Sequence, residues 1–154
     1  MYEVVGGWVA STPEVGAKLM LDRHSRHHAW RARQWWERLP VVADVDREEL
    51  LQAAADGLWG RPLLAAAGME TTVGRLAAAY RVLLPRMSVA LALHKEAADA
   101  VSDGSSLRTI GIVGPDVAAD WAEGEALLQG LLVGEDQVGA AAKAARAVEV
   151  LFAT

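Results

Sequence analysis

The chain has 154 residues, a net charge of −5 and no cysteine. Its length suits one domain with a substantial core. The lack of cysteine excludes disulfides, a thiolate nucleophile and cysteine-ligated zinc or iron–sulfur sites. Proteins that bind nucleic acid are more often basic overall, so the acidic balance argues against that partner. Abundant alanine and leucine with a single phenylalanine favour helices over sheets.

The sequence carries no sign of a membrane or secreted protein. No uninterrupted apolar run reaches the roughly 18 residues that a transmembrane helix needs. The opening residues, MYEVVGGWVASTPE, lack the basic region and apolar core of a secretory signal. We therefore expect a cytoplasmic protein with no membrane partner.

Apolar residues recur three and four positions apart along most of the chain, which is the spacing of helices that bury one face. Joined by short loops, such segments predict a single all-α domain over residues 1–154, an antiparallel four-helix bundle. Pro85 falls inside a segment whose apolar rhythm continues, so we expect a kink there rather than a hairpin. The expected helices cover residues 13–39, 63–101, 107–134 and 135–152, with a minor helix over 47–57 and a short first helix over 2–10.

Turn residues set the ends of the early helices. We expect Thr12 to cap the long second helix and Pro40 to end it. The minor helix should point Leu50, Leu51 and Ala54 into the core.

The stretch 22–40 holds three of the four histidines and three of the six tryptophans. On a helix, two of these histidines, one turn apart, fall on the buried face, while His27 points elsewhere. We expect burial and nearby arginines to keep the pKa values of His24 and His28 below about 6.5, with an ordinary pKa for His27. The predicted buried face comprises Ala17, Leu21, His24, His28, Ala32, Trp35 and Leu39.

Two histidines four residues apart present both imidazoles to one point, as in helical metal sites. His94, on the apolar face of the 63–101 segment, can supply a third nitrogen. This pattern predicts a metal site of His24, His28 and His94 with an open coordination position. The alternative is a polar layer in the core, where hydrogen bonds satisfy all three histidines. We favour this alternative, because no carboxylate shares the face.

Tyr80 and Asp120 are further polar residues that lean inward on their helices. With the histidines they would form an acid–base set in a bundle cavity. We favour the simpler interpretation, in which Tyr80 packs its ring and donates its hydroxyl to a backbone carbonyl. The candidate ligand-pocket residues are His24, His28, Trp35, Tyr80, His94 and Asp120.

The tandem tryptophans point about 100° apart on a helix, so they cannot share one surface. We expect Trp30 and Trp35 in the core and Trp36 at an interface or a pocket mouth. An alanine-rich last helix allows close helix approach, and a homodimer is the commonest oligomer. We therefore predict a homodimer.

The arginines of the 22–40 stretch lie mostly off the predicted buried face. We expect them to pair with acidic residues in a solvated surface, as Asp22 and Arg26 do at a spacing of four. Binding of an anionic ligand is the alternative. These arginines are Arg23, Arg26, Arg31, Arg33 and Arg38.

The stretch 22–40 and the segment LLPRMSVALALHKEAADAVSDGSSLRTI resemble the ferritin-like superfamily, and more narrowly small actinobacterial ferritin-like proteins with a histidine-rich second helix. The resemblance implies a four-helix bundle and, in the catalytic branch, a di-iron or di-manganese centre built on two Glu-x-x-His motifs. This chain has neither motif: Ser25 follows Asp22 by three residues, and Glu123 follows Asp120. From the resemblance we therefore expect the fold to carry over and the classical centre to be absent.

Three functions follow from these observations. We favour a bundle of non-classical type whose histidine-lined interior binds a small organic ligand, with or without catalysis. The first alternative is a metal-dependent oxidase or hydroxylase using non-haem iron or manganese, which the missing glutamates disfavour. The second alternative is a non-enzymatic dimerisation or structural module.

Overall fold

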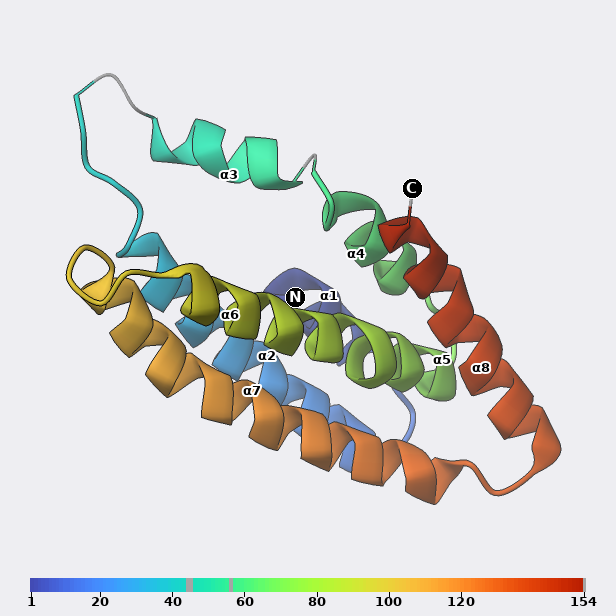
Figure 1. Ribbon diagram of the computed structural model, residues 1–154. Helices are drawn as coiled ribbons and strands as arrows, with labels where there is room; N and C mark the ends of the chain where they lie inside the picture. Colours follow the sequence, from blue (N-terminus) through green and yellow to red (C-terminus); the bar gives the residue numbers. More distant parts are fainter. Residues whose placement is uncertain (44–45, 56, 154) are drawn as a thin grey trace.

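The computed structural model describes residues 1–43, 46–55 and 57–153, except for the side chains of residues 53–55. Within these ranges the chain is helical and has no strand, which confirms the predicted all-α class. A π-helical segment, Ala78–Leu83, joins two of the helices, and a 3-10 turn, Val150–Phe152, follows the last. The helices are α1 (Tyr2–Trp8), α2 (Val15–Trp36), α3 (Arg47–Ala55), α4 (Gly60–Ala67), α5 (Thr72–Ala77), α6 (Leu84–Ala97), α7 (Gly104–Leu131) and α8 (Glu135–Glu149) (Figure 1).

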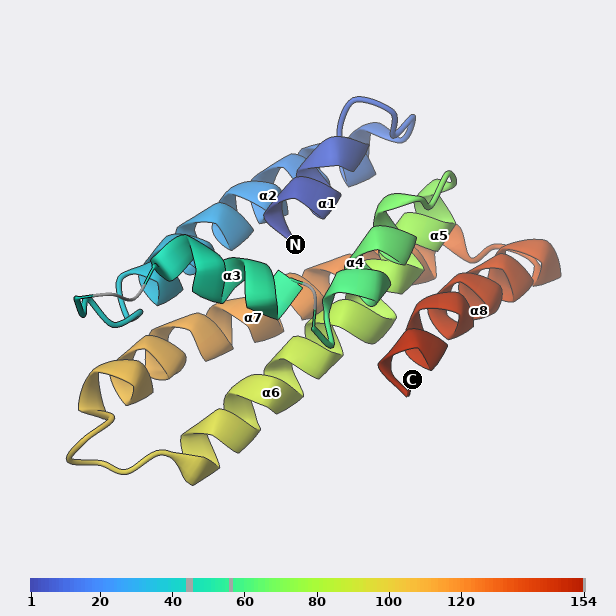
Figure 2. The same cartoon turned by 90° about the horizontal axis from the view of Figure 1, so that it is seen from above.

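The longest helical stretches, α2, α7 and the continuous helix from α5 through α6, form the frame of the molecule (Figures 1 and 2). α6 and α7 are joined by a short turn and pack against each other, while α2 packs against α7. α1 folds back on α2, and α8 packs against α5 and the π-helical segment. This arrangement places side chains from α2 and α7 opposite one another.

α2 begins two residues later than predicted and ends at Trp36. Thr12 is not its cap: Glu14 takes that position, and the buried Thr12 hydroxyl donates to the carbonyl oxygen of Trp8 at 2.8 Å. The prediction that His24 and His28 share the buried face is confirmed. That face comprises Ala17, Met20, Leu21, His24, Ser25, His28 and Arg31.

The far end of α2 differs from the prediction. Ala32 is exposed, Trp30 is 42% exposed, and Trp35 and Trp36 are half-buried. At this end of α2, Arg31 is therefore the buried residue, and Trp35 is only partly buried. The predicted core position of Trp30 is wrong, because Trp30 lies off the face of α2 that buries His28 and Arg31.

The predicted 63–101 segment is two helical rods. Its break lies between Ala67 and Thr72, where the Thr71 hydroxyl accepts a hydrogen bond from the backbone N–H of Gly74 at 3.1 Å and caps α5. From there the helix runs without a break to Ala97. The chain makes no hairpin at Pro85, as predicted, and a π-helical segment ends at Leu83, two residues before the proline.

α3 is set apart from the other helices in Figure 1. Leu50 and Leu51 are 41% and 49% exposed, so the prediction that they point into the core is wrong. Ala54, predicted with them, lies outside the described side chains. The guanidinium of Arg47 lies over the ring of Trp36, 5.5 Å from its centroid. This contact tethers the start of α3 to the end of α2.

The core is densest around the middle of the α5–α6 rod, where Leu76 through Tyr80 and Val82 through Leu84 are buried. By length and composition alone, the helix Thr72–Ala97 is also long and apolar enough to cross a membrane. Burial of its central residues is equally what the core helix of a soluble protein shows.

Candidate metal centre and neighbouring cavity

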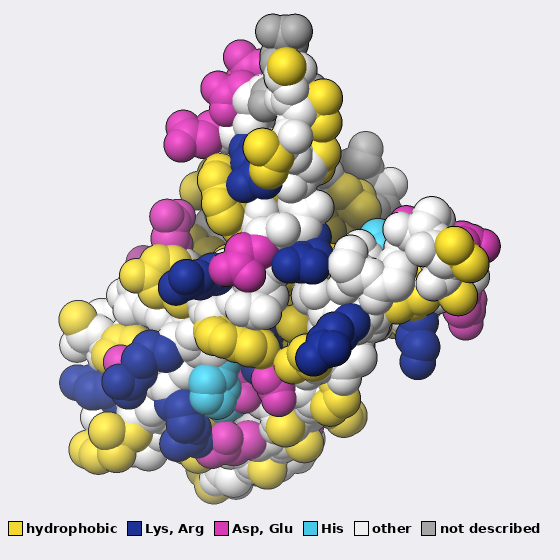
Figure 3. All heavy atoms as spheres, turned by 90° about the vertical axis from the view of Figure 1, so that its left-hand side faces the viewer, with side chains coloured by type: hydrophobic (Ala, Val, Ile, Leu, Met, Phe, Trp, Pro, Cys, Tyr) yellow, Lys and Arg dark blue, Asp and Glu magenta, His cyan; other side chains and the backbone are white. Residues whose placement is uncertain are grey.

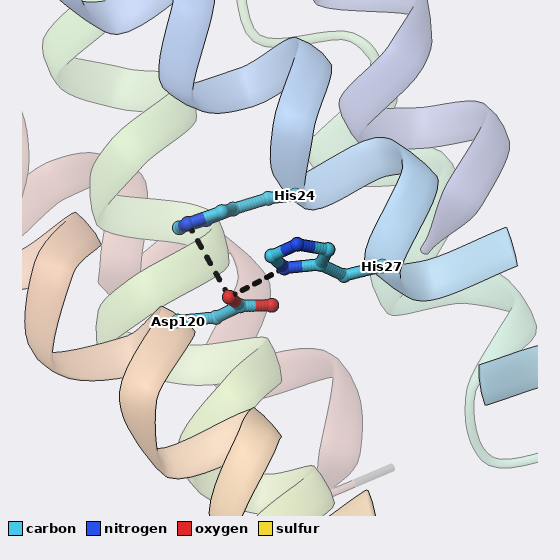
Figure 4. Close-up of side chains that lie close together, drawn as sticks. All are labelled: His24, His27 and Asp120. Atoms are coloured by element: carbon cyan, nitrogen blue, oxygen red, sulfur yellow. Dashed lines mark hydrogen bonds and ion pairs between the residues drawn. The ribbon is translucent and has the colours of Figure 1, made fainter. Parts of the chain in front are cut away.

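Two pairs of polar residues face each other across the α2–α7 contact. His24 and His27 lie three residues apart on α2, and Asp120 and Glu123 have the same spacing on α7. Residues three apart on a helix are neighbours on one side of it. Both imidazoles therefore point toward the carboxylates, as Figure 4 shows for His24, His27 and Asp120.

The ligand atoms of this cluster are close together. Nδ1 of His27 donates to Oδ1 of Asp120 at 2.9 Å, and Nε2 of His24 lies 3.4 Å from the same oxygen. Nε2 of His24 also donates to Oε2 of Glu123 at 3.1 Å. Among the described residues, one group of potential metal ligands, His24, His27 and Asp120, has ligand atoms that all lie within 4.8 Å of one another.

A second layer of residues orients these four side chains. Tyr80, from the π-helical segment, lies with its hydroxyl 2.7 Å from Nδ1 of His24. Because Nε2 of His24 faces two carboxylates and carries the proton, the Tyr80 hydroxyl donates to Nδ1. Arg31 donates to Oδ2 of Asp120 at 2.5 Å in a buried pair.

The carboxylate of Glu123, half-exposed at the edge of the cluster, is bound by Arg23. This edge reaches the protein surface, since the side chain of His27 is 44% exposed. On the face drawn in Figure 3, histidine atoms lie among arginine or lysine and acidic side chains. Small ions can therefore reach the cluster from solvent.

Tyr80 reaches His24 because α7 has no side chain in its way. Tyr80 is fully buried, and its ring lies against Gly124. A Cβ atom at Gly124 would overlap the ring carbons of Tyr80 at well under 3.0 Å. The glycine and the π-helical segment, a distortion frequent at functional sites, together place the tyrosine hydroxyl.

Burial keeps the two inner histidines neutral. It lowers the pKa of His24, although Asp120 and Glu123 act to raise it. Burial, with the charge of Arg31, lowers the pKa of His28 to about 3. Both directions are those expected from the sequence.

The carboxyl groups are held ionised. Burial acts to raise the pKa of Asp120, but the hydrogen bond from His27 and the charges around it keep that pKa below its usual value. The hydrogen bond from Arg23 lowers the pKa of Glu123. Burial raises the pKa of Tyr80, so its hydroxyl keeps its proton.

An open cavity of about 740 Å³ lies beside this cluster and is lined by residues from α1, α2, α4, α6 and α7. His28 and Arg31 form its polar wall, and apolar side chains such as Trp35 and Leu91 form most of the rest. His94 also lines it from α6, with its ring centroid 6.1 Å from that of Trp35.

The predicted site residues thus divide into two groups. His24, Tyr80 and Asp120 meet in the cluster, whereas His28, Trp35 and His94 line the cavity. The predicted metal set of His24, His28 and His94 is not the group that the structure brings together. The favoured interpretation of Tyr80 is also wrong, because its hydroxyl bonds an imidazole rather than a backbone carbonyl.

Three residues of the cluster were not predicted. His27 was expected to point away from the buried face, and Arg31 to lie in a solvated surface. Glu123 was noted for its spacing but not assigned a role. The sequence feature that could have indicated this cluster is a shared spacing. His24 and His27 are three residues apart, and so are Asp120 and Glu123.

Comparison of the chain with protein-family models, with curated proteins and with solved structures found no match. The resemblance to the ferritin-like superfamily therefore stays a prediction.

Proposed function

We propose that the protein binds one divalent transition-metal ion between α2 and α7. The ligands are Nε2 of His24, Nδ1 of His27, Oδ1 of Asp120 and a carboxylate oxygen of Glu123. The observation that carries the proposal is the convergence of two imidazole nitrogens and the Asp120 carboxylate from two helices, with the Glu123 carboxylate bonded to His24 beside them. Two histidines with carboxylates are ligands that iron, manganese and zinc accept.

The spacing of the ligand atoms suits an ion. Atoms about 2.1 Å from a metal lie about 3.0 Å apart in octahedral geometry and about 3.4 Å apart in tetrahedral geometry. The separations between nitrogen and oxygen here are 2.9, 3.1 and 3.4 Å. Hydrogen bonds have the same lengths, so a metal-free polar layer explains these distances equally well. An experiment must therefore distinguish the metal centre from that layer.

The second layer supports metal binding as well. A metal-bound histidine usually donates its other ring N–H to an acceptor, and a metal-bound carboxylate is usually hydrogen-bonded. With Nε2 of His24 bound to an ion, the imidazole would carry its proton on Nδ1, and this N–H would donate a hydrogen bond to the Tyr80 oxygen. Arg31 holds the second oxygen of Asp120 in place.

The ligand set fits one ion rather than two. A di-metal centre of the ferritin-like kind takes four glutamates and two histidines, whereas this cluster offers two carboxylates and two histidines. Arg23 and Arg31 each pair with one of the two ionised carboxylates, so the cluster has little negative charge left to hold a second cation. We propose a ferritin-like bundle with a single-ion centre.

The reaction class that such a centre serves is oxidation or hydroxylation. Two histidines and a carboxylate with open positions are the ligand set of non-haem iron oxygenases, where the bound iron supplies oxygen chemistry. His24, His27 and Asp120 match that set, and Glu123 would add a second carboxylate. Here the chain's own residues orient His24, keep the carboxylates ionised and leave one edge open to solvent.

Cobalt titration of the chelator-treated protein tests the proposal. Co²⁺ should bind with one ion per chain and give the visible absorption of a nitrogen- and oxygen-ligated site. Asp120→Asn and His27→Gln should each lose this binding, and the exposed His94→Gln should keep it. Circular dichroism of each variant separates lost binding from lost fold.

Tyr80→Phe should weaken cobalt binding about tenfold, because outer partners of metal ligands contribute 10- to 100-fold. Binding unchanged by Asp120→Asn, or no binding by the intact protein, refutes the metal centre and leaves the polar layer. A stoichiometry of two ions refutes the single-ion centre.

A further inference from the structure

An open trough runs beneath α3. Figure 1 shows α3 standing above the bundle, and in Figure 2 it lies between α2 and α6. Besides the cavity of about 740 Å³ described above, two further hollows of about 490 and 670 Å³ are found here. Ala32 lines all three, so they adjoin one another at this small side chain. Each hollow has the size of a small-molecule site.

Apolar and aromatic side chains supply most of the walls of the trough. Trp35 lines the first and second hollows, and Leu63 lines the first and third. Leu51, which belongs to α3, lines the second and third. The lining contributed by α2 and the turn after it runs from His28 to Leu39, about 16 Å, which is about the length of an extended chain of twelve carbons.

α3 roofs the trough without filling it. Leu51 lies opposite Ala32 and Trp36 of α2 in the second hollow, yet about half of its surface is exposed. Apolar surface left in water costs free energy, which an apolar occupant of the trough would recover. A slender chain can pass beneath α3, whereas a folded partner can only cover α3 from outside.

The shape of the trough selects the kind of occupant. Its hollows meet at Ala32 and do not form one round chamber, so an occupant that follows the trough along α2 is long and has to bend. A rigid polycyclic molecule of compact shape fills one hollow at most. An unbranched alkyl chain can follow the whole path, and its polar head can stay in water at the open edge.

We propose that this trough binds the alkyl chain of a fatty acid or a related long-chain compound, with α3 closing over it. Leu51 packs on the chain from one side, and Ala32 and Trp35 pack on it from the other. None of the four proposed metal ligands lines the trough, so this inference does not rest on the metal centre.

Quenching of tryptophan fluorescence by ω-bromododecanoate tests the proposal. Trp35, Trp36 and Trp59 line the trough, and bromine quenches tryptophan on contact. One probe molecule should bind per chain, below the concentration at which the probe forms micelles. Dodecanoate and dodecanol should each displace it; stronger displacement by dodecanoate identifies a fatty acid, and equal displacement identifies a neutral long-chain compound. Each CH₂ group removed from the competitor should weaken displacement about fourfold.

Two exposed positions make the test specific. Leu51→Gln should weaken binding about tenfold, since it replaces the apolar roof by a polar side chain. Ala32→Phe, which fills the junction of the hollows, should abolish binding. Leu58→Gln is the matched control, because Leu58 is also exposed but lines none of the three hollows. Leu51 and Ala32 are exposed, so both variants should fold, and circular dichroism checks this.

No binding of the probe, binding unchanged in both variants, or tighter binding of pyrene than of dodecanol would overturn the proposal. A homodimer that excludes the probe and that Leu51→Gln dissociates would overturn it too, because the trough would then be an interface between two copies of this chain. Each of these results leaves the cobalt titration unaffected, since no occupant of the trough takes part in it.

Discussion

Replacing Gly124 by alanine should destabilise the protein through Tyr80. The added methyl would overlap the tyrosine ring, which is fully buried and tied by its hydroxyl to His24. Overpacking of this kind costs about 1–3 kcal/mol, and the overlap puts the value near the upper end. Alanine is favoured over glycine in a helix by about 1 kcal/mol, so the net loss should be about 2 kcal/mol.

Gly111→Ala is the matched control in the same helix. Gly111 is exposed, and an added Cβ there meets nothing within 4 Å, so this variant should gain up to about 1 kcal/mol. Urea denaturation followed by circular dichroism should therefore separate the two variants by about 3 kcal/mol. If Gly124→Ala proves as stable as Gly111→Ala, the close packing of Tyr80 on α7 is wrong. The placement of its hydroxyl at His24 would then lack support.

Three further outcomes concern charge and assembly. The folded state resists protonation of His28, whose pKa is lowered to about 3. Stability present above the unfolded pKa of about 6.5 should therefore fall by about 1.4 kcal/mol per pH unit toward pH 3. A urea-denaturation series should show this slope, and it should be shallower in His28→Phe. Arg23→Gln should tighten cobalt binding two- to fivefold, since it frees Glu123 from an exposed ion pair; weaker binding would contradict the ligand role of Glu123. Light scattering should show a homodimer, and a mass of 16.4 kDa, that of one chain, would refute it.

Helical spacing was enough to predict the all-α class and the buried positions of His24 and His28. A period near 3.6 fixes which residues share a face, and burial of that face then sets the direction of the histidine pKa values. The same reasoning failed for Trp30 and Leu50. Whether an apolar side chain is covered depends on a neighbouring element, and spacing within one helix does not say where that neighbour ends.

The candidate site was harder to predict because its parts come from three separate elements. Asp120 was recognised as inward-leaning, but its partners lie some ninety residues away, on α2. Arg31 was assigned to the surface because arginine is seldom buried without a counter-charge. Its burial follows from the position of Asp120, which only the packing of α2 on α7 reveals.

The π-helical segment has a consequence for the register of the α5–α6 rod. A turn closed by hydrogen bonds five residues apart holds one residue more than an α-helical turn. Residues after Leu83 are therefore rotated by about 100° relative to an unbroken α-helix that continues α5. Deleting one residue from Ala78–Leu83 would let the rod become regular and remain fully helical. It would nevertheless turn either Tyr80 away from His24 or the Leu84 side of α6 away from the core. In this rod, a variant can therefore keep its full helical content and still lose the correct placement of its side chains.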